Sequence, residues 1–174
     1  MDNVQLDHLQ HRPTPAPFAL RILLHDLVVP MNVGSVFRIA DAMGVEMIHL
    51  TGCSALPPNR KLRKTSRATE LHVPFRHAAD PVPVLHELKA AGFRVVSLEL
   101  TSASIDIREL PAPAGEPVCL VLGSENHGVS QVLLDLSDQT VHIPMRGVHS
   151  SMNVATACAI ATFEILRSST RLPH

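Results

Sequence analysis

The sequence predicts an α/β fold in which a mainly parallel sheet carries helices on both faces. Runs such as VCLVL (residues 118–122) are apolar throughout, which is typical of strands that are covered on both sides. These runs alternate with segments of helical periodicity in the recurring order strand, helix, strand. The chain has 174 residues, and since a domain usually takes roughly 100 to 200 residues, we expect one domain.

The elements of this domain follow one another from about Phe18 onward. The prolines of RPTPAP (residues 12–17) restrain the backbone, so we expect a flexible N-terminal arm at residues 1–17 and the folded domain at residues 18–174. Within the domain, short apolar runs and helical patterns alternate in this order: LRILLHDL, VGSVFRIADAMG, VEMIHLTG, PVLHELKAAG, FRVVSLEL, PVCLVLG, QVLLDL, TVHIPM and MNVATACAIATFEILR.

The helix predicted at GSVFRIADAMG (residues 34–44) shows the expected periodicity. Its apolar residues recur at spacings of three and four: Val36, Ile39, Ala40 and Met43. Asn32 is expected to cap the start of the helix, and Gly44 lies where a left-handed terminating residue is favoured. Arg38 falls beside the apolar stripe and can be a surface residue whose stem covers a hydrophobic edge. Because ligands in open α/β sheets bind at the carboxyl ends of strands, Asn32 and Arg38 are also candidate site residues.

Composition and charge exclude several classes of protein. Hydrophobic residues make up 45% and charged residues 18% of the chain, and the formal net charge is −1, so any contact with nucleic acid must come from a local patch. The three cysteines lack CxxC spacing, and the 11 histidines include no HExxH pattern, so we expect neither a disulfide nor a metal site. We find no signal peptide and no run of about 18 apolar residues, which predicts a cytoplasmic protein.

The stretch GSENHG (residues 123–128) follows an apolar run and invites comparison with a phosphate-binding loop. That loop requires a lysine after its second glycine, whereas this chain has Val129 there. Glu125 adds a negative charge within the turn and would repel a triphosphate. The ligand of this loop should therefore be neutral or positively charged.

Three stretches together resemble the motifs of the SpoU (TrmH-like) RNA ribose 2′-O-methyltransferases of the SPOUT superfamily. They are NVGSVFRIADAMGV (32–45), LVLGSENHGVS (120–130) and IPMRGVHSSMNVATACAIATFE (143–164), and NRKLRKTSRATELHVPF is similar to the family's segment between its second and third strands. The resemblance implies an α/β domain with a C-terminal trefoil knot, S-adenosylmethionine held in the knot, and a homodimer. S-adenosylmethionine carries a sulfonium cation, which agrees with a glycine loop that lacks lysine.

The resemblance also implies which residues contact the cofactor. Because Gly123 has no side chain, it would let the cofactor approach the backbone. Leu100 is expected to end the strand VVSLEL and to form a wall of the cofactor pocket. The expected cofactor-binding residues are Leu100, Leu122, Gly123, Ile143, Met145, Ser151 and Met152.

For catalysis the resemblance points to Arg38 at the reacting ribose. Asn32, Ser151 and Asn153 would position the hydroxyl, the phosphate and the motif loops, and Glu125 would organise its loop and is a candidate partner of Arg38. Glu125 as a solvated turn residue is the alternative. Since the pKa of arginine exceeds roughly 12, we expect Arg38 to stabilise a developing alkoxide and to clamp a phosphate rather than to act as an ordinary base.

Two places depart from the family pattern. Met152 stands where leucine is commoner and Ala155 where serine often follows the Asn-Val pair. Arg67 and Ala68 replace the more usual Gly-Ala pair, which leaves the local loop shape open.

The stretch NRKLRKTSR is a candidate RNA-binding loop. Its cations can contact several phosphates, although a solvated basic loop is the alternative: Arg60, Lys61, Arg63, Lys64 and Arg67. Because the chain has no Trp, no Tyr and five Phe, we expect recognition of backbone and shape rather than base stacking. Larger relatives add an N-terminal RNA-binding domain for which this chain has no room, so transfer RNA is expected rather than ribosomal RNA.

The C-terminal helix predicts a homodimer. Ala155, Ala157, Ala159 and Ala161 leave small side chains on more than one face, so another backbone can approach closely, although packing inside one chain is the alternative. By resemblance, pairing through this helix and the first-motif helix would bring Arg38 of one subunit near the cofactor of the other. Two rival functions remain open, namely a different nucleotide-using α/β enzyme and a non-catalytic RNA-binding paralogue.

Overall fold

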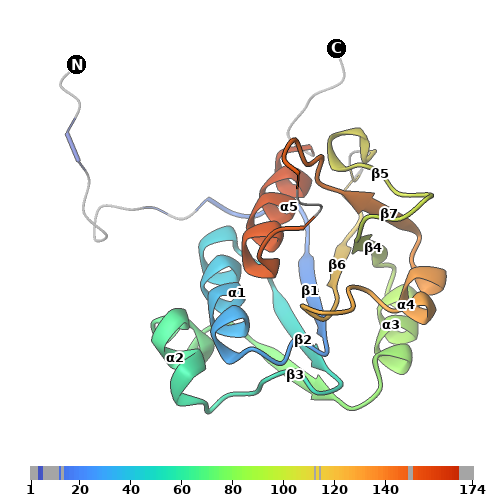
Figure 1. Ribbon diagram of the computed structural model, residues 1–174. Helices are drawn as coiled ribbons and strands as arrows, with labels where there is room; N and C mark the ends of the chain where they lie inside the picture. The colour runs from blue at the N-terminus through green and yellow to red at the C-terminus, as the bar shows by residue number, and fades with distance from the viewer. Residues whose placement is uncertain are drawn as a thin grey trace.

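The computed structural model describes residues 4–5, 12, 14–111, 113, 115–148 and 151–168, so most of the predicted N-terminal arm lies outside the described residues. Seven strands form one sheet in the order β3-β2-β1-β6-β4-β7-β5 (Figure 1). Every neighbouring pair is parallel, which confirms the predicted α/β class and places the carboxyl ends of all strands at the same edge. The strands are β1 (Leu20–His25), β2 (Met47–Thr51), β3 (Phe75–Ala78), β4 (Arg94–Leu98), β5 (Ile105–Asp106), β6 (Val118–Leu122) and β7 (Gln139–His142).

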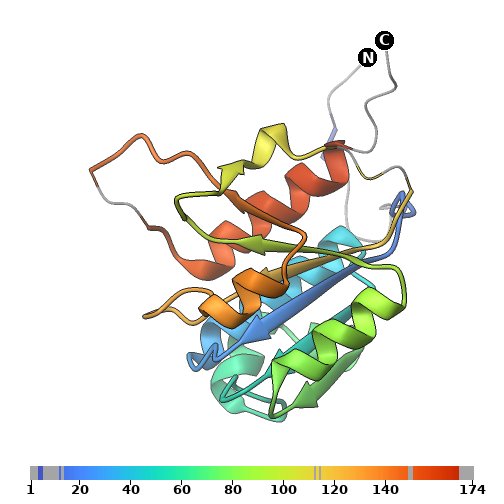
Figure 2. The ribbon, with the colours of Figure 1, turned by 90° about the vertical axis from the view of Figure 1, so that its right-hand side faces the viewer.

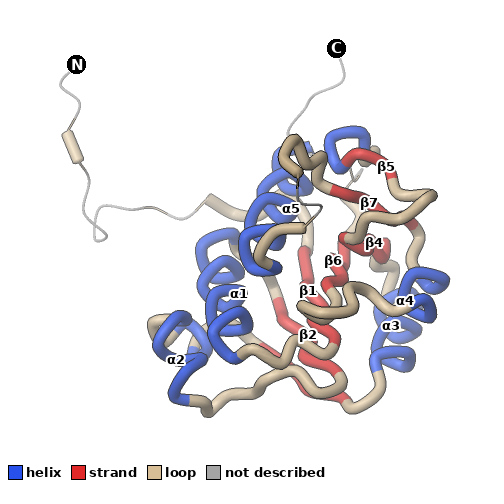
Figure 3. The backbone as a smooth tube through the Cα atoms, viewed as in Figure 1, coloured by secondary structure: helices blue, strands red, loops and turns tan. Residues whose placement is uncertain are grey.

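Helices cover both faces of the sheet, as the apolar strands predicted. Five α-helices and two short 3₁₀ helices are described: α1 (Pro30–Met43), α2 (Arg60–Ser66), η1 (Thr69–Leu71), α3 (Pro81–Ala90), η2 (Ile107–Glu109), α4 (Gln131–Leu136) and α5 (Val154–Ser168). Figure 3 shows α1, α2 and α5 on one side of the sheet and α3 and α4 on the other. Among the described residues, no helix has both the length and the apolar character needed to cross a membrane.

The two layers follow from the alternation of side chains along the strands. Along β1, Ile22 and Leu24 join the core beneath α1 and α5, whereas Leu23 faces Leu85 of α3 and Leu133 of α4. When the molecule is turned, α3 and α4 lie in front of the strands and α1 lies behind them (Figure 2). Both faces of the central strands are therefore buried, and the ends of the strands remain for a site.

Helix α1 starts earlier than the sequence predicted. Pro30 occupies the first turn, where its fixed φ angle suits a helix and its missing N–H is not needed. Val29 is the N-cap residue and offers no side-chain hydrogen bond, so the prediction that Asn32 caps this helix is wrong. Asn32 lies inside the first turn, and its side chain is free for other contacts. The predicted end is confirmed, because Gly44 adopts a left-handed conformation with φ of 68°.

The stretch NRKLRKTSR forms helix α2 and is not a loop. Asn59 caps it by accepting hydrogen bonds from the amides of Lys61 and Leu62 at 2.9 and 3.2 Å. The helix packs tightly against α1 at Gly34, where a β-carbon would lie 2.2 Å from the Leu62 carbonyl oxygen. Thr65 also donates from its hydroxyl to the carbonyl oxygen of Met31 at 2.9 Å. The two helices therefore form one unit.

Candidate active site

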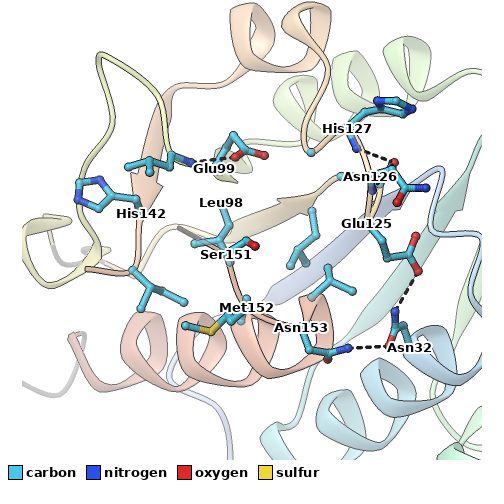
Figure 4. A pocket seen from close by; sticks show the side chains of 18 of the residues that line it. Asn32, Leu98, Glu99, Glu125, Asn126, His127, His142, Ser151, Met152 and Asn153 are labelled. Carbon is cyan, nitrogen blue, oxygen red and sulfur yellow. Dashed lines mark hydrogen bonds between the residues drawn. The ribbon is translucent and has the colours of Figure 1, made fainter. Parts of the chain in front are cut away.

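A cavity of about 680 Å³ opens at the carboxyl ends of β4, β6 and β7 (Figure 4). Ligand sites for small molecules usually have about 300 to 1,000 Å³, so the size suits a nucleoside-sized ligand. Segments that are distant in the sequence form its wall: residues 98–100, 122–128, 142–143, 145, 151–154 and 157, together with Val29 and Asn32. This is the edge at which ligands bind in open α/β sheets.

All seven residues that the sequence assigned to a cofactor line this cavity. They come from four separate regions of the chain: Leu100, Leu122, Gly123, Ile143, Met145, Ser151 and Met152. The place of Leu100 differs from the prediction, because β4 ends at Leu98 and Leu100 lies in the following loop with 56% of its surface exposed.

The loop of residues 123–128 closes on itself at the end of β6. The backbones of Ser124 and Gly128 exchange two hydrogen bonds of 3.1 and 2.9 Å, and the Ser124 hydroxyl accepts from the amides of Asn126 and His127. A β-carbon on Gly123 would lie 2.0 Å from the carbonyl oxygen of Gly128. Gly123 is thus required by the closure of the loop itself, which is a different reason from the predicted approach of a ligand.

Glu125 connects this loop to the start of α1. Its carboxylate accepts hydrogen bonds from the amides of Val28 and Val29 at 3.3 and 3.1 Å and from Asn32 Nδ2 at 3.0 Å. The N-terminus of a helix has unpaired N–H groups and a partial positive charge, so a carboxylate is stabilising there. Glu125 is therefore anchored in the protein, and its expected pairing with Arg38 is not formed.

Asn32, which donates to Glu125, also accepts a hydrogen bond from Asn153 at the start of α5. Asn153 donates from Nδ2 to Asn32 Oδ1 at 3.0 Å, and its own Oδ1 accepts from the amides of Ala155 and Thr156, which caps α5. Figure 4 shows the resulting chain of hydrogen bonds from Glu125 through Asn32 to Asn153 along one wall of the cavity. Three of the five predicted catalytic residues are thereby linked through Asn32, from which Glu125 and Asn153 lie 93 and 121 positions away in the sequence.

Arg38 lies outside this cavity. It is exposed on α1, six residues after Asn32. Six helical residues correspond to a rise of roughly 9 Å and about one and two-thirds turns, so the two side chains leave different faces of the helix. The single chain thus brings Asn32, Glu125, Ser151 and Asn153 to the cavity but not Arg38.

The charge of the cavity wall restricts the ligand. Among the described residues that line it, the acidic residues are Glu99 and Glu125, and no lysine or arginine is present. A phosphate group would find no cation there. The wall suits a ligand that is neutral or positively charged, as the sequence of the loop indicated.

The sequence missed several residues of the wall. Leu98 and His142 end β4 and β7, and Glu99 follows Leu98. The position of each at the carboxyl end of a parallel strand was the signal that would have identified them. His142 is oriented by a contact of 3.0 Å between its Nδ1 and the hydroxyl of Ser104.

The predicted RNA-binding cations lie on one exposed surface. Four belong to α2, and the fifth directly follows it: Arg60, Lys61, Arg63, Lys64 and Arg67. Leu62 and Ser66 form the buried face of this short helix, so the cations point away from α1.

A parallel α/β sheet with a lysine-free glycine loop and a cavity at its carboxyl edge defines the class of nucleoside-cofactor-binding α/β proteins. Within that class, the chain belongs to the SpoU rRNA Methylase family, whose sequence model matches residues 19–163. The resemblance found in the three motifs is thereby confirmed.

Curated relatives agree with this membership. A protein of Staphylococcus epidermidis assigned to the TrmH family of tRNA/rRNA methyltransferases is 30% identical over 95% of this chain and 66% of its own length. An uncharacterised tRNA/rRNA methyltransferase of Mycobacterium tuberculosis is 37% identical over 79% of this chain and 48% of its own. The chain thus spans about half to two thirds of the length of these relatives.

Solved structures show the same fold. An rRNA methyltransferase from Sinorhizobium meliloti with AdoMet bound has a TM-score of 0.81 and 27% identity, and the match covers 90% of this chain and 61% of the other. A structure that concerns the 2-OH methylation of C/U34 on tRNA has a TM-score of 0.78 and 28% identity, and the match covers 88% of this chain and 98% of the other.

Proposed function

We propose that this chain is an S-adenosylmethionine-dependent methyltransferase that modifies the ribose 2′-hydroxyl of RNA, with transfer RNA as its substrate in the cytoplasm. One observation carries the proposal: the cavity lined by all seven expected cofactor residues lies directly against the hydrogen-bonded chain of Glu125, Asn32 and Asn153. The family to which the chain belongs supports the class of reaction.

The wall of the cavity fits this cofactor. Leu122, Ile143 and Met145 offer apolar surface for an adenine ring, and the backbone of the loop after β6 offers hydrogen bonds. Glu99 and Glu125 leave the wall negative, which favours a cation. When bound, S-adenosylmethionine supplies a methyl group on a sulfonium ion, which makes that methyl group electrophilic.

The residues at the mouth of the cavity would place the ribose. Asn32 and Asn153 are fixed to each other, and Ser151 lies beside them on the wall. These three side chains would hold the hydroxyl and its neighbouring phosphate in line with the methyl group, and such positioning is itself a large part of a catalytic effect. Arg38 would stabilise the developing alkoxide and clamp the phosphate, because a guanidinium ion is a planar donor that stays charged.

Transfer RNA is favoured by the extent of one structural match. The protein studied for the 2-OH methylation of C/U34 on tRNA is covered over 98% of its length by this chain, so the two share nearly the whole of that protein. The cations on α2 would contact the RNA phosphates. Ribosomal RNA is the alternative substrate, and a non-catalytic RNA-binding paralogue is the alternative function.

We further propose that the active protein is a knotted homodimer. Two large apolar side chains of α5 are exposed, Ile160 by 41% and Phe163 by 56%, and a partner would cover them. Arg38 is exposed on α1 outside its own cavity, where it can serve the cavity of a second chain. The proposal of a C-terminal trefoil knot is supported by membership of the family.

Two measurements test the function. Nucleosides from the RNA of cells with and without the protein, compared by mass spectrometry, should differ by one 2′-O-methylated nucleoside in the tRNA fraction. Loss of that nucleoside from ribosomal RNA would assign the alternative substrate, and identical RNA would exclude methylation. S-adenosylmethionine should also raise the melting temperature of the purified protein, whereas ATP should not.

A further inference from the structure

We propose that Glu99 is a positioning residue that holds the glycine loop, residues 123–128, closed at the cofactor cavity. Glu99 directly follows β4, and its backbone amide donates to the carbonyl oxygen of Val141 at 2.9 Å, so its main chain is fixed to the sheet. Its carboxylate accepts from the amide of Leu100 at 3.0 Å and from the amide of Val129 at 2.9 Å. The inference rests on the proposed cofactor of this cavity.

The carboxylate of Glu99 also touches the last residue of the loop. A β-carbon on Gly128 would lie 2.1 Å from Glu99 Oε2 and 2.9 Å from its carboxyl carbon. Gly128 has a φ of 66°, a conformation that glycine adopts without steric cost. Glycine at this position therefore lets the backbone turn and lets the carboxylate lie directly against it.

The loop is consequently anchored at both ends. At its start, β6 holds Leu122 opposite Leu24 of β1, and at its end Glu99 holds Val129. Glu125 lies between these two anchors and reaches the start of α1 and Asn32. A loop released at Val129 would shift Glu125, so the effect of Glu99 should reach both the cofactor wall and the Asn32–Asn153 pair.

A carboxylate is the side chain that suits this task. It offers two oxygens that only accept hydrogen bonds, and both face backbone N–H groups here. An amide of the same shape keeps one accepting oxygen and turns a donor toward the other N–H group. Glu99→Gln should therefore be intermediate between the wild type and Glu99→Ala.

The first test measures the binding of S-adenosylhomocysteine by calorimetry. Glu99→Ala should raise its dissociation constant by at least about tenfold, since hydrogen bonds to a charged acceptor are lost, and Glu99→Gln by less. The amide of Val129 should exchange its hydrogen faster in Glu99→Ala even without ligand. Glu87→Ala, an exposed glutamate on α3, is the matched control and should change neither quantity.

A double-mutant cycle separates this role from a general loss of stability. Gly128→Ala should weaken binding in the wild type by forcing the carboxylate away, and it should weaken binding less in the Glu99→Ala background, because the contact is already gone. Additive effects, or a fall in melting temperature with unchanged affinity and unchanged Val129 exchange, would overturn the proposal. Failure of the wild type to bind S-adenosylhomocysteine would instead count against the proposed function.

Discussion

At the scale of single residues, Glu125 fixes the two residues that lead into α1. No side chain of α1 caps its start, and the carboxylate of Glu125 reaches across from another loop to accept hydrogen bonds from the amides of Val28 and Val29. The amides of Val28 and Val29 are thus paired by Glu125, a residue of the cavity wall, and the free-energy cost of unpaired N–H groups is avoided. The same carboxylate fixes Asn32, so one side chain sets both the helix and the site.

Arg38 should separate catalysis from cofactor binding. Since its side chain lies outside the cavity, Arg38→Ala should leave the affinity for S-adenosylhomocysteine within about threefold of the wild type while methyl transfer falls at least about 100-fold. Arg38→Lys should not restore activity, because a point charge does not reproduce the planar donor. Arg76→Ala, at an exposed arginine of β3, is the control and should remain active. Full activity of Arg38→Ala would remove this residue from the reaction.

His49 should make the fold sensitive to acid. Its Nε2 atom is buried without a hydrogen-bond partner among the described residues. Burial, followed by the charges of Arg21 and Arg76, lowers the pKa of His49 to about 4. In the unfolded chain His49 binds a proton below about pH 6.5, whereas in the folded chain it binds one only below about pH 4. The free energy of unfolding therefore falls as the pH drops from about 6.5 to about 4.

The size of this effect can be measured by urea unfolding at pH 7 and pH 5. His49 should account for a loss of about 2 kcal/mol between the two conditions. His49→Leu should remove that part of the loss, and His86→Leu, at an exposed position of α3, should leave it in place. An unchanged pH dependence in His49→Leu would mean that this imidazole is not held neutral.

The sequence could predict that Asn32, Glu125 and six of the seven expected cofactor residues come together, because they belong to three motifs of fixed order and spacing. The contacts among them could not. Asn32 was assigned to a helix cap because asparagine is common there, yet Pro30 two residues earlier already marked the first turn. Glu99 carries no motif of its own, and only the packing of β4 beside β6 and β7 brings it to the glycine loop.

At the scale of elements, helix α2 ends in a strained turn. Arg67 and Ala68 have φ angles of 56° and 74°, which side chains other than glycine rarely adopt. Compared with the Gly-Ala pair expected from the family, Arg67 replaces the glycine and Ala68 keeps the alanine. Arg67 therefore adopts a backbone conformation that suits glycine, and its β-carbon makes that conformation energetically unfavourable.

Ala68→Gly should relieve part of this strain. We expect the free energy of unfolding to rise by about 1 kcal/mol, since a left-handed residue with a β-carbon is disfavoured by that order. Ala42→Gly, at an exposed position within α1, should lower it by about 0.5 to 1 kcal/mol, because glycine is unfavourable inside a helix. The measurement is equilibrium denaturation in urea. Equal losses in both variants would show that Ala68 is not strained.

The sequence predicted β7 and α4, although they have only four and six residues, and missed β3, β5 and α2. The four residues of β3, FRHA, include no buried side chain, and β5 has two residues, so neither strand shows an apolar run in the sequence. In α2, four of the seven residues are cations, so the helical periodicity rests on Leu62 alone among its apolar residues. The cap residue Asn59 was the available signal for that helix.

At the scale of the whole molecule, the exposed apolar side chains of α5 and the place of Arg38 together predict a dimer with shared sites. The interface should bury on the order of 2,000 Å² or more in total, the size of an obligate pair. Chains with Arg38→Ala should therefore complement chains with Gly123→Val, whose loop cannot close.

The complementation should be quantitative. Equal mixing gives half heterodimers, each with one intact site, so about one quarter of the wild-type activity should return. Each variant alone should stay inactive, which is the control. A monomer in sedimentation at micromolar concentration would refute the dimer, and dimers without complementation would confine each site to one chain.

The close contact between α1 and α2 at Gly34 has a thermodynamic consequence. The start of α1 is held by Glu125 of the cofactor loop, and the same helix packs against the cationic helix α2. A cofactor that orders the loop should therefore also order α2, and an RNA that orders α2 should also order the loop. Linkage then requires reciprocity: S-adenosylhomocysteine should tighten the binding of tRNA, and tRNA should tighten the binding of S-adenosylhomocysteine by the same factor. Titrations in both orders measure that factor, and Gly34→Ala, which would push α2 away from α1, should reduce it toward unity.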